Sequence, residues 1–218
     1  RIYSDGRDLL NKAGVTLSED KLKIAVCLRS WHGEEEYLPV LIRALRGLRR
    51  QYPVQYLFFP FQYGCDEQIS HRVLEALGAE GDPMAAGDCI VPGRHSPEQV
   101  AAMLKEMDGV IAMRLHAVIL GSLSCVPAFG LIYDPKVECF MKRAGLEDRF
   151  MAVDEIAGNE ENLLSGLCQW LSDLNELSKA MQPKIEEMVS LTRRNAQIVK
   201  QLLNSNLSVA SGQRHHLF

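Results

Sequence analysis

Apolar runs alternate with amphipathic segments along the first two thirds of the chain, and this pattern predicts strands separated by helices. The predicted strands are residues 23–28, 54–59, 88–91, 109–113, 128–133 and 150–153. Because these runs are apolar throughout, rather than alternating with polar residues, we expect both faces of each strand to be buried. The order of the elements therefore predicts the α/β class, with a right-handed, doubly wound parallel sheet.

The predicted helices begin and end at residues that favour helix termini. They cover residues 5–13, 37–50, 66–78 and 116–125, a segment that starts at 96, and residues 134–144. Ser96 is the clearest start, because Pro97 follows it in the first turn and Gln99 occupies the capping-box position. We interpret residues 34–36 as a solvated turn. The helix after that turn is expected to present its arginines to solvent, namely Arg43, Arg46, Arg49 and Arg50.

After Glu160 the pattern predicts helices alone, with leucines along one face. Pro183 is expected to break or kink this run, and a second helix follows it. We therefore divide the chain into a Rossmann-like lobe at 1–158, C-terminal helices at 159–204 and a frayed tail at 205–218. Two interpretations of the helices stay open: they wrap this lobe, or they reach toward another lobe that this chain lacks.

Composition narrows the class of protein. The chain has 218 residues, 47% of them hydrophobic, and a net charge of −4, which excludes a broadly basic nucleic-acid binder and favours a folded core. No apolar run approaches the roughly 20 residues of a transmembrane segment, and the polar residues 1–8 are no signal peptide, so we expect a cytoplasmic chain. The six cysteines are spread singly and are interpreted as buried free thiols, without a zinc site or a disulfide framework.

Cationic side chains follow two of the predicted strands, where open parallel sheets bind ligands. Arg114 and His116 come directly after the fourth strand, and Lys136 lies in the first turn of the helix that Asp134 is expected to cap. A cation at a helix N-terminus opposes the helix dipole by about 0.3–1 kcal/mol, unless an anion sits between them. If these junctions are neighbours, the three cations predict a small dianion or trianion as ligand; alternatively, Lys136 extends into solvent.

Further candidates lie at the first and third junctions: Arg29, His32, Arg94 and His95. Each of them is interpreted either as a group at the edge of the same crevice or as a solvated loop residue. The sequence has no Walker loop and no GxGxxG, HExxH or GxSxG motif. Their absence argues against a nucleotide hydrolase, a dinucleotide-binding enzyme, a metalloprotease and a serine hydrolase.

Residues 108–117 and 127–137 resemble the polysaccharide pyruvyl transferase family, most closely the CsaB-type enzymes that act on the secondary cell-wall polysaccharide that anchors surface-layer (S-layer) proteins. The resemblance covers residues 23–153 and, more loosely, the trailing helices. It implies a GT-B-like enzyme of two lobes, of which this chain is the C-terminal one and the N-terminal lobe is missing. It also implies phosphoenolpyruvate as the donor, without a metal or other cofactor.

The acceptor implied by the resemblance is N-acetylmannosamine in a lipid-diphosphate-linked oligosaccharide, modified as a 4,6-ketal near the inner face of the membrane. His116 and Lys136 fall on functional positions of the family, and Arg114 and Leu115 belong to its donor-contacting Arg-Leu-His segment. Our hypothesis gives His116 the acid/base role, Arg114 a carboxylate or phosphate, and Lys136 the phosphate.

Other substrate contacts and other functions are also open. Arg29 and His95 are further substrate-binding candidates. One alternative function is a GT-B glycosyltransferase or nucleotide-sugar epimerase lobe, in which Asp154 or Glu155 would hold a ribose. The other is an isolated donor-binding lobe that is inactive until its second half completes the crevice.

Overall fold

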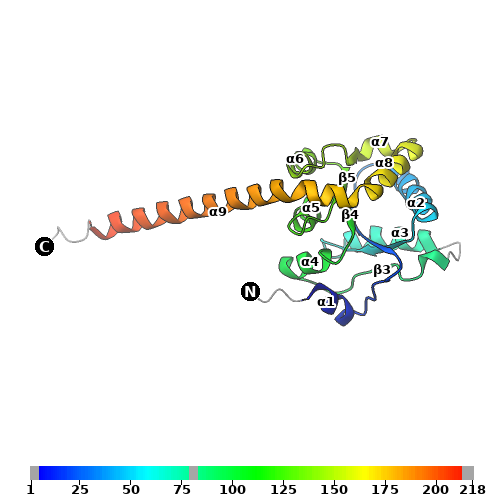
Figure 1. The fold of residues 1–218 in the computed structure, drawn as a ribbon, viewed down its shortest axis with the longest axis horizontal. Coiled ribbons are helices and arrows are strands. Elements are labelled where there is room, and N and C mark those ends of the chain that lie inside the picture. The colour runs from blue at the N-terminus through cyan, green and yellow to red at the C-terminus, as the bar shows by residue number, and fades with distance from the viewer. Residues whose placement is uncertain (1–4, 79–82, 213–218) are drawn as a thin grey trace.

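In the computed structural model, which describes residues 5–78 and 83–212, six parallel strands form one sheet in the order β3-β2-β1-β4-β5-β6 (Figure 1). The strands are β1 (Leu22–Cys27), β2 (Val54–Phe58), β3 (Cys89–Ile90), β4 (Gly109–Ala112), β5 (Ala128–Ile132) and β6 (Phe150–Ala152). This is the strand order of a Rossmann-like fold. The predicted doubly wound α/β class is therefore confirmed.

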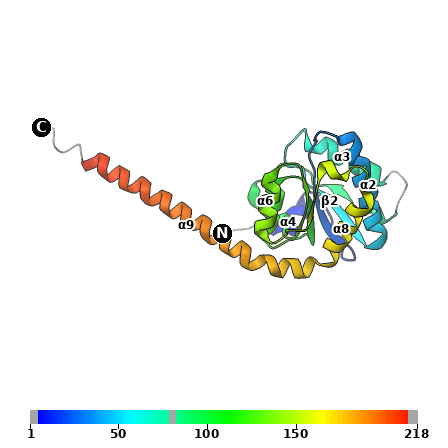
Figure 2. The same cartoon turned by 90° about the horizontal axis from the view of Figure 1, so that it is seen from above.

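Helices cover both faces of the sheet (Figure 2). Their bounds are α1 (Gly6–Lys12), α2 (Glu34–Gln51), α3 (Asp66–Gly78), α4 (Pro97–Leu104), α5 (Leu115–Ser122), α6 (Pro135–Ala144), α7 (Val153–Ile156), α8 (Glu160–Ser172) and α9 (Leu174–Gly212), with a 3-10 turn at Pro83–Ala85. One buried cluster joins the sheet to α2, α3 and α8, and a second joins it to α1, α4, α5, α6 and the start of α9. The predicted burial of both faces is correct for β2, β4, β5 and most of β1, and wrong for the edge strands β3 and β6, which are only half-buried.

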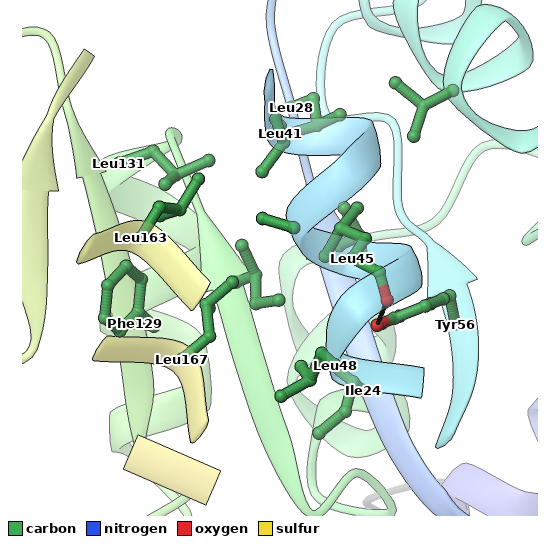
Figure 3. Close-up of a cluster of buried hydrophobic side chains, with 14 of the residues drawn as sticks. Ile24, Leu28, Leu41, Leu45, Leu48, Tyr56, Phe129, Leu131, Leu163 and Leu167 are labelled. Atoms are coloured by element: carbon green, nitrogen blue, oxygen red, sulfur yellow. Dashed lines mark hydrogen bonds between the residues drawn. The ribbon is translucent and has the colours of Figure 1, made fainter. Parts of the chain in front are cut away.

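Helix α8 is part of the first core. Figure 3 shows side chains of α8, β5 and α2 meeting in this cluster, among them Leu163, Leu167 and Leu45. Beyond them, Trp170 packs edge-on against Phe129, with 6.1 Å between the ring centroids. Trp170 is fully buried, so the first trailing helix wraps the lobe.

Helix α2 differs from its prediction at two places. It begins at Glu34 rather than residue 37, because Gly33 turns in the left-handed region at φ 73° and the glutamates then lie at the positive end of the helix dipole. The interpretation of its arginines as a solvated face is wrong for Arg49, which is 1% exposed. Its guanidinium pairs with Asp88 and lies 4.8 Å from the ring centroid of Tyr56.

The trailing helices divide at Asp173, whose carboxylate pairs with Arg149, and not at Pro183. Helix α9 continues through Pro183 because Met181 and Ile185, on either side of the proline, are both buried in the second core. The prediction of a frayed tail from residue 205 is wrong for residues 205–212, which belong to α9. The rest of the predicted tail, 213–218, lies outside the described residues.

Beyond its first turns α9 leaves the lobe as a single projecting helix (Figures 1 and 2). Leu191, Ile198 and Val199 are exposed on this part. Within the described chain, no helix combines the length and the apolar character that crossing a bilayer demands. The interpretation of the cysteines as buried is correct only for Cys27, and burial raises the pKa of its thiol.

A substitution of Gly109, at the start of β4, tests how closely α8 packs on the sheet. A Cβ atom at this position would lie 2.5 Å from the Trp170 ring, so we expect Gly109→Ala to lower the free energy of unfolding by about 1–3 kcal/mol, measured by urea denaturation. Gly78→Ala is the control, since a Cβ there meets nothing within 4 Å. Equal effects of the two substitutions would show that Trp170 does not restrict this position.

Candidate functional site

The strand order reverses between β1 and β4, so the helices that follow these two strands leave toward opposite faces of the sheet. Such a switch point opens a crevice at the carboxyl edge, where open α/β sheets bind their ligands. Arg29 follows β1 and Arg114 follows β4. Strands β4 and β5 are paired directly, which confirms that the Arg114–His116 junction and the Lys136 junction are neighbours.

Arg114 is held by the protein itself. Its Nε donates to Asp66 Oδ2 at 2.9 Å, its Nη2 pairs with Asp66 Oδ1, and Nη2 also donates to Gln62 Oε1 at 3.1 Å. Asp66 is completely buried, and its carboxylate also accepts the backbone N–H groups of Phe61 and Gln62 at 3.0 and 2.8 Å. The structure therefore places Arg114 in an internal ion pair, and not as an isolated cation.

Arg29 is built into an aromatic cluster at the ends of β1 and β5. Its guanidinium carbon lies 5.2 Å from the ring centroid of Trp31 and 4.7 Å from that of Tyr133, and its Nη1 donates to the Tyr133 hydroxyl at 3.0 Å. His32 is exposed beside Trp31. This cluster joins the two strand ends on either side of β4.

His116 is exposed in the first turn of α5, a helix whose N-cap residue, Arg114, makes no side-chain capping bond. Leu115 beside it packs partly into the second core, so its side chain supports the start of the helix. His116 lines a cavity of about 500 Å³ together with Arg94 and His95. Three of the predicted site residues are thus brought together.

Lys136 occupies the first turn of α6 and is exposed. Asp134 caps this helix as predicted, because its carboxylate accepts the backbone N–H of Lys136 at 2.9 Å. Within the part of the chain that the structure describes, no carboxylate pairs with the Lys136 ammonium. Lys136 does not line the cavity beside His116, so the two residues stand at adjacent strand ends rather than in one pocket.

Sequence reasoning missed Asp66 and Tyr133 as members of this edge. Asp66 was interpreted only as the start of a helix. Its position at the start of the helix that follows the second strand was the available signal, because only β1 lies between that strand and β4, which Arg114 follows. Asp154 and Glu155, the candidates for a ribose contact, are exposed in the short helix α7.

Comparison with known proteins identifies the family. The sequence profile described as polysaccharide pyruvyl transferase matches residues 9–135, more than half of the chain. The chain belongs to the polysaccharide pyruvyl transferase family. The match includes β1 to β5 and both Arg114 and His116, and it ends one residue before Lys136. A search of curated proteins gives no significant match.

Solved structures similar to this pyruvyl transferase family member are GT-B glycosyltransferases, and at their low identity they show the fold alone. The Escherichia coli ADP-heptose lipopolysaccharide heptosyltransferase II has a TM-score of 0.56 and 14% identity, covering 78% of this chain and 51% of its own. WaaG, a glycosyltransferase involved in lipopolysaccharide biosynthesis, has a TM-score of 0.53 and 15% identity, over 86% and 47%. Trehalose 6-phosphate synthase from Burkholderia multivorans has a TM-score of 0.54 and 11% identity, and the match covers 97% of this chain and 46% of that protein. This chain spans about half the length of these structures.

Asp66 is expected to be the most sensitive residue of this edge. Asp66→Ala leaves the guanidinium of Arg114 and two backbone N–H groups without their acceptor, so we expect the free energy of unfolding to fall by about 3–5 kcal/mol, measured by urea denaturation. Glu138→Ala removes an exposed ion pair with Lys142 and should cost less than about 1 kcal/mol. A loss at Asp66 no larger than that at Glu138 would contradict the inferred role of the buried pair.

Proposed function

We propose that this family member transfers pyruvate from phosphoenolpyruvate to two hydroxyl groups of a sugar, forming a cyclic ketal. The observation that carries the proposal is the pair of exposed residues His116 and Lys136, each in the first turn of a helix that follows one of two adjacent strands. Helix N-termini attract anions through their free N–H groups and the helix dipole. Phosphoenolpyruvate brings a carboxylate and a phosphate to such an edge.

The three site residues take different parts in this proposal. The ammonium of Lys136 binds the phosphate. Arg114 contributes orientation more than net charge, because Asp66 neutralises it while its Nη1 edge makes no hydrogen bond within the described structure. His116 transfers protons, the task for which an imidazole suits neutral pH.

With these groups, every proton and every bond of the transfer is accounted for. His116 as imidazolium protonates the methylene carbon of the enol, and the first sugar hydroxyl attacks the adjacent carbon. Phosphate then leaves that carbon, and the second hydroxyl takes its place. Of the two hydroxyl protons, one restores the imidazolium and the other leaves with the phosphate. The products are the ketal and inorganic phosphate.

The remaining features of the proposal come from the resemblance to the CsaB-type enzymes. In it, this chain is the C-terminal lobe of a GT-B-like protein, and the preceding lobe completes the crevice. The acceptor is N-acetylmannosamine in a lipid-diphosphate-linked precursor of the cell-wall polysaccharide. Such a carrier would bring the enzyme to the inner face of the membrane. The match to GT-B structures over half of their length supports the two-lobed arrangement.

His116→Gln tests the acid/base assignment in the intact protein. Glutamine keeps much of the shape and the hydrogen bonding but does not transfer protons, so we expect kcat to fall by about 10²–10⁴-fold with little change in the affinity for phosphoenolpyruvate. Phosphate release measures the rate, and His71→Gln on the exposed side of α3 is the matched control. Unchanged turnover in His116→Gln would remove the assignment.

Lys136→Met tests donor binding in the same protein. Loss of the ammonium should raise the KM for phosphoenolpyruvate about tenfold or more. Lys142→Met, which removes the exposed pair with Glu138 and the cation–π contact with Phe150 away from the strand ends of the site, should leave that KM unchanged. The thermal shift of the wild type with phosphoenolpyruvate, compared with that with a UDP-sugar, checks the donor class, because a bound ligand stabilises the folded state. Stabilisation by the UDP-sugar alone would favour a glycosyltransferase instead.

A further inference from the structure

The cavity beside His116 has no assigned ligand, although three of the predicted residues, Arg94, His95 and His116, line it. Its walls come from three segments: the loop between β2 and α3, the segment from β3 into α4, and α5. The lining residues other than Arg94, His95 and His116 are Phe59, Pro60, Phe61, Tyr63, Val91, Gly93, Pro97, Val100 and Leu120. It lies on the β2–β3 side of His116, whereas Lys136 follows β5 on the other side.

The walls of this cavity are held in place before any ligand binds. On one side, the buried carboxylate of Asp66 accepts the N–H groups of Phe61 and Gln62 and also holds Arg114, the residue two positions before His116. On the other side, Ser96 and Gln99 form the capping box that fixes the start of α4. Pre-organisation of this kind lowers the entropy cost of binding.

The lining combines aromatic faces with a few polar groups. Tyr63 lies at the rim, 37% exposed, and the Arg94 guanidinium is stacked 4.8 Å from its ring centroid. His95 contacts the carbonyl of Pro92 at 2.9 Å through Nε2, which leaves its Nδ1 for a ligand. Aromatic rings, two imidazoles and one guanidinium therefore surround about 500 Å³.

This chemistry disfavours the donor as the occupant. Phosphoenolpyruvate carries charge on almost every polar atom, and an aromatic wall cannot replace the water that it would lose. A pyranose ring has the opposite character, because its C–H face packs on aromatic rings while its hydroxyls hydrogen-bond to imidazole and guanidinium groups. The volume lies within the range of small-molecule sites.

We propose that this cavity binds a hexopyranose unit of the acceptor saccharide, with the ring packed on Tyr63 and Phe61 and a hydroxyl directed to His116. The inference rests on the proposed function, and it adds a location to it. The acceptor lies on the β2–β3 side of His116, and the donor lies on the Lys136 side. His116 then stands between the enol carbon and the attacking hydroxyl.

Tyr63 is the residue to vary, because its exposure at the rim makes loss of folding a minor concern. In the intact protein, Tyr63→Ala should raise the KM for the saccharide acceptor about tenfold and leave the KM for phosphoenolpyruvate within twofold. Tyr63→Phe keeps the ring and should show less than a third of that rise. Tyr52→Ala is the control, since Tyr52 lies two residues before β2, at the opposite edge of the sheet, and contacts Ser172. A rise in the KM for phosphoenolpyruvate with an unchanged acceptor KM would overturn the assignment.

A binding measurement separates this inference from the proposed function. Saturation-transfer NMR of the methyl glycoside of N-acetylmannosamine, without phosphoenolpyruvate, should show contact with the wild type and a loss of signal in Tyr63→Ala. Glycoside binding without any pyruvate transfer by the wild type would contradict the function while supporting the cavity. If the protein transfers pyruvate but Tyr63→Ala leaves the glycoside signal unchanged, the cavity assignment is contradicted while the function stands. Displacement of the bound glycoside by phosphoenolpyruvate or by UDP would contradict the cavity assignment in the same way.

Discussion

The buried carboxylate of Asp66 and the guanidinium of Arg114 join the two halves of the sheet across the end of β1. β1 lies between β2 and β4, and the pair reaches over it from the helix after β2 to the junction after β4. Four N–H donors converge on the two oxygens of Asp66, which offsets the cost of burying the charge. The loop at Phe61 and the start of α5 are placed relative to this one group, and so is His116.

At the carboxyl edge of the sheet, the cations that fix the positions of other residues are therefore not the cations that can offer their charge to a ligand. Asp66 neutralises the charge of Arg114, and the neighbours of the Arg29 guanidinium are the aromatic rings of Trp31 and Tyr133, which carry no net charge. The exposed ammonium of Lys136, the imidazoles of His95 and His116 and the exposed guanidinium of Arg94 are then available to respond to a ligand. Arg29 and Arg114 supply a rigid frame, while the other cationic groups are free to bind a ligand.

The sequence predicted what local patterns determine, and it did not predict what distant partners determine. Uniformly apolar strands and helix-start signals were sufficient for the fold and for the neighbouring positions of His116 and Lys136, because β4 and β5 are consecutive. Helical spacing identified the face that carries Arg49 but not Asp88, 39 residues away, and nothing local linked Arg114 to Asp66, 48 residues away. Pro183 was misjudged because burial of its neighbours outweighs its intrinsic effect.

The projecting part of α9 has a thermodynamic consequence. Its backbone hydrogen bonds are internal to one helix, so beyond the lobe they open by fraying from the end, at a free energy set by helix–coil propensity and not by the core. Unfolding of this chain is then two events, a cooperative loss of the sheet and a gradual melting of the extension. Circular dichroism at 222 nm reports the sum of both, whereas tryptophan fluorescence follows the sheet, because Trp31 and Trp170 both pack in its first core.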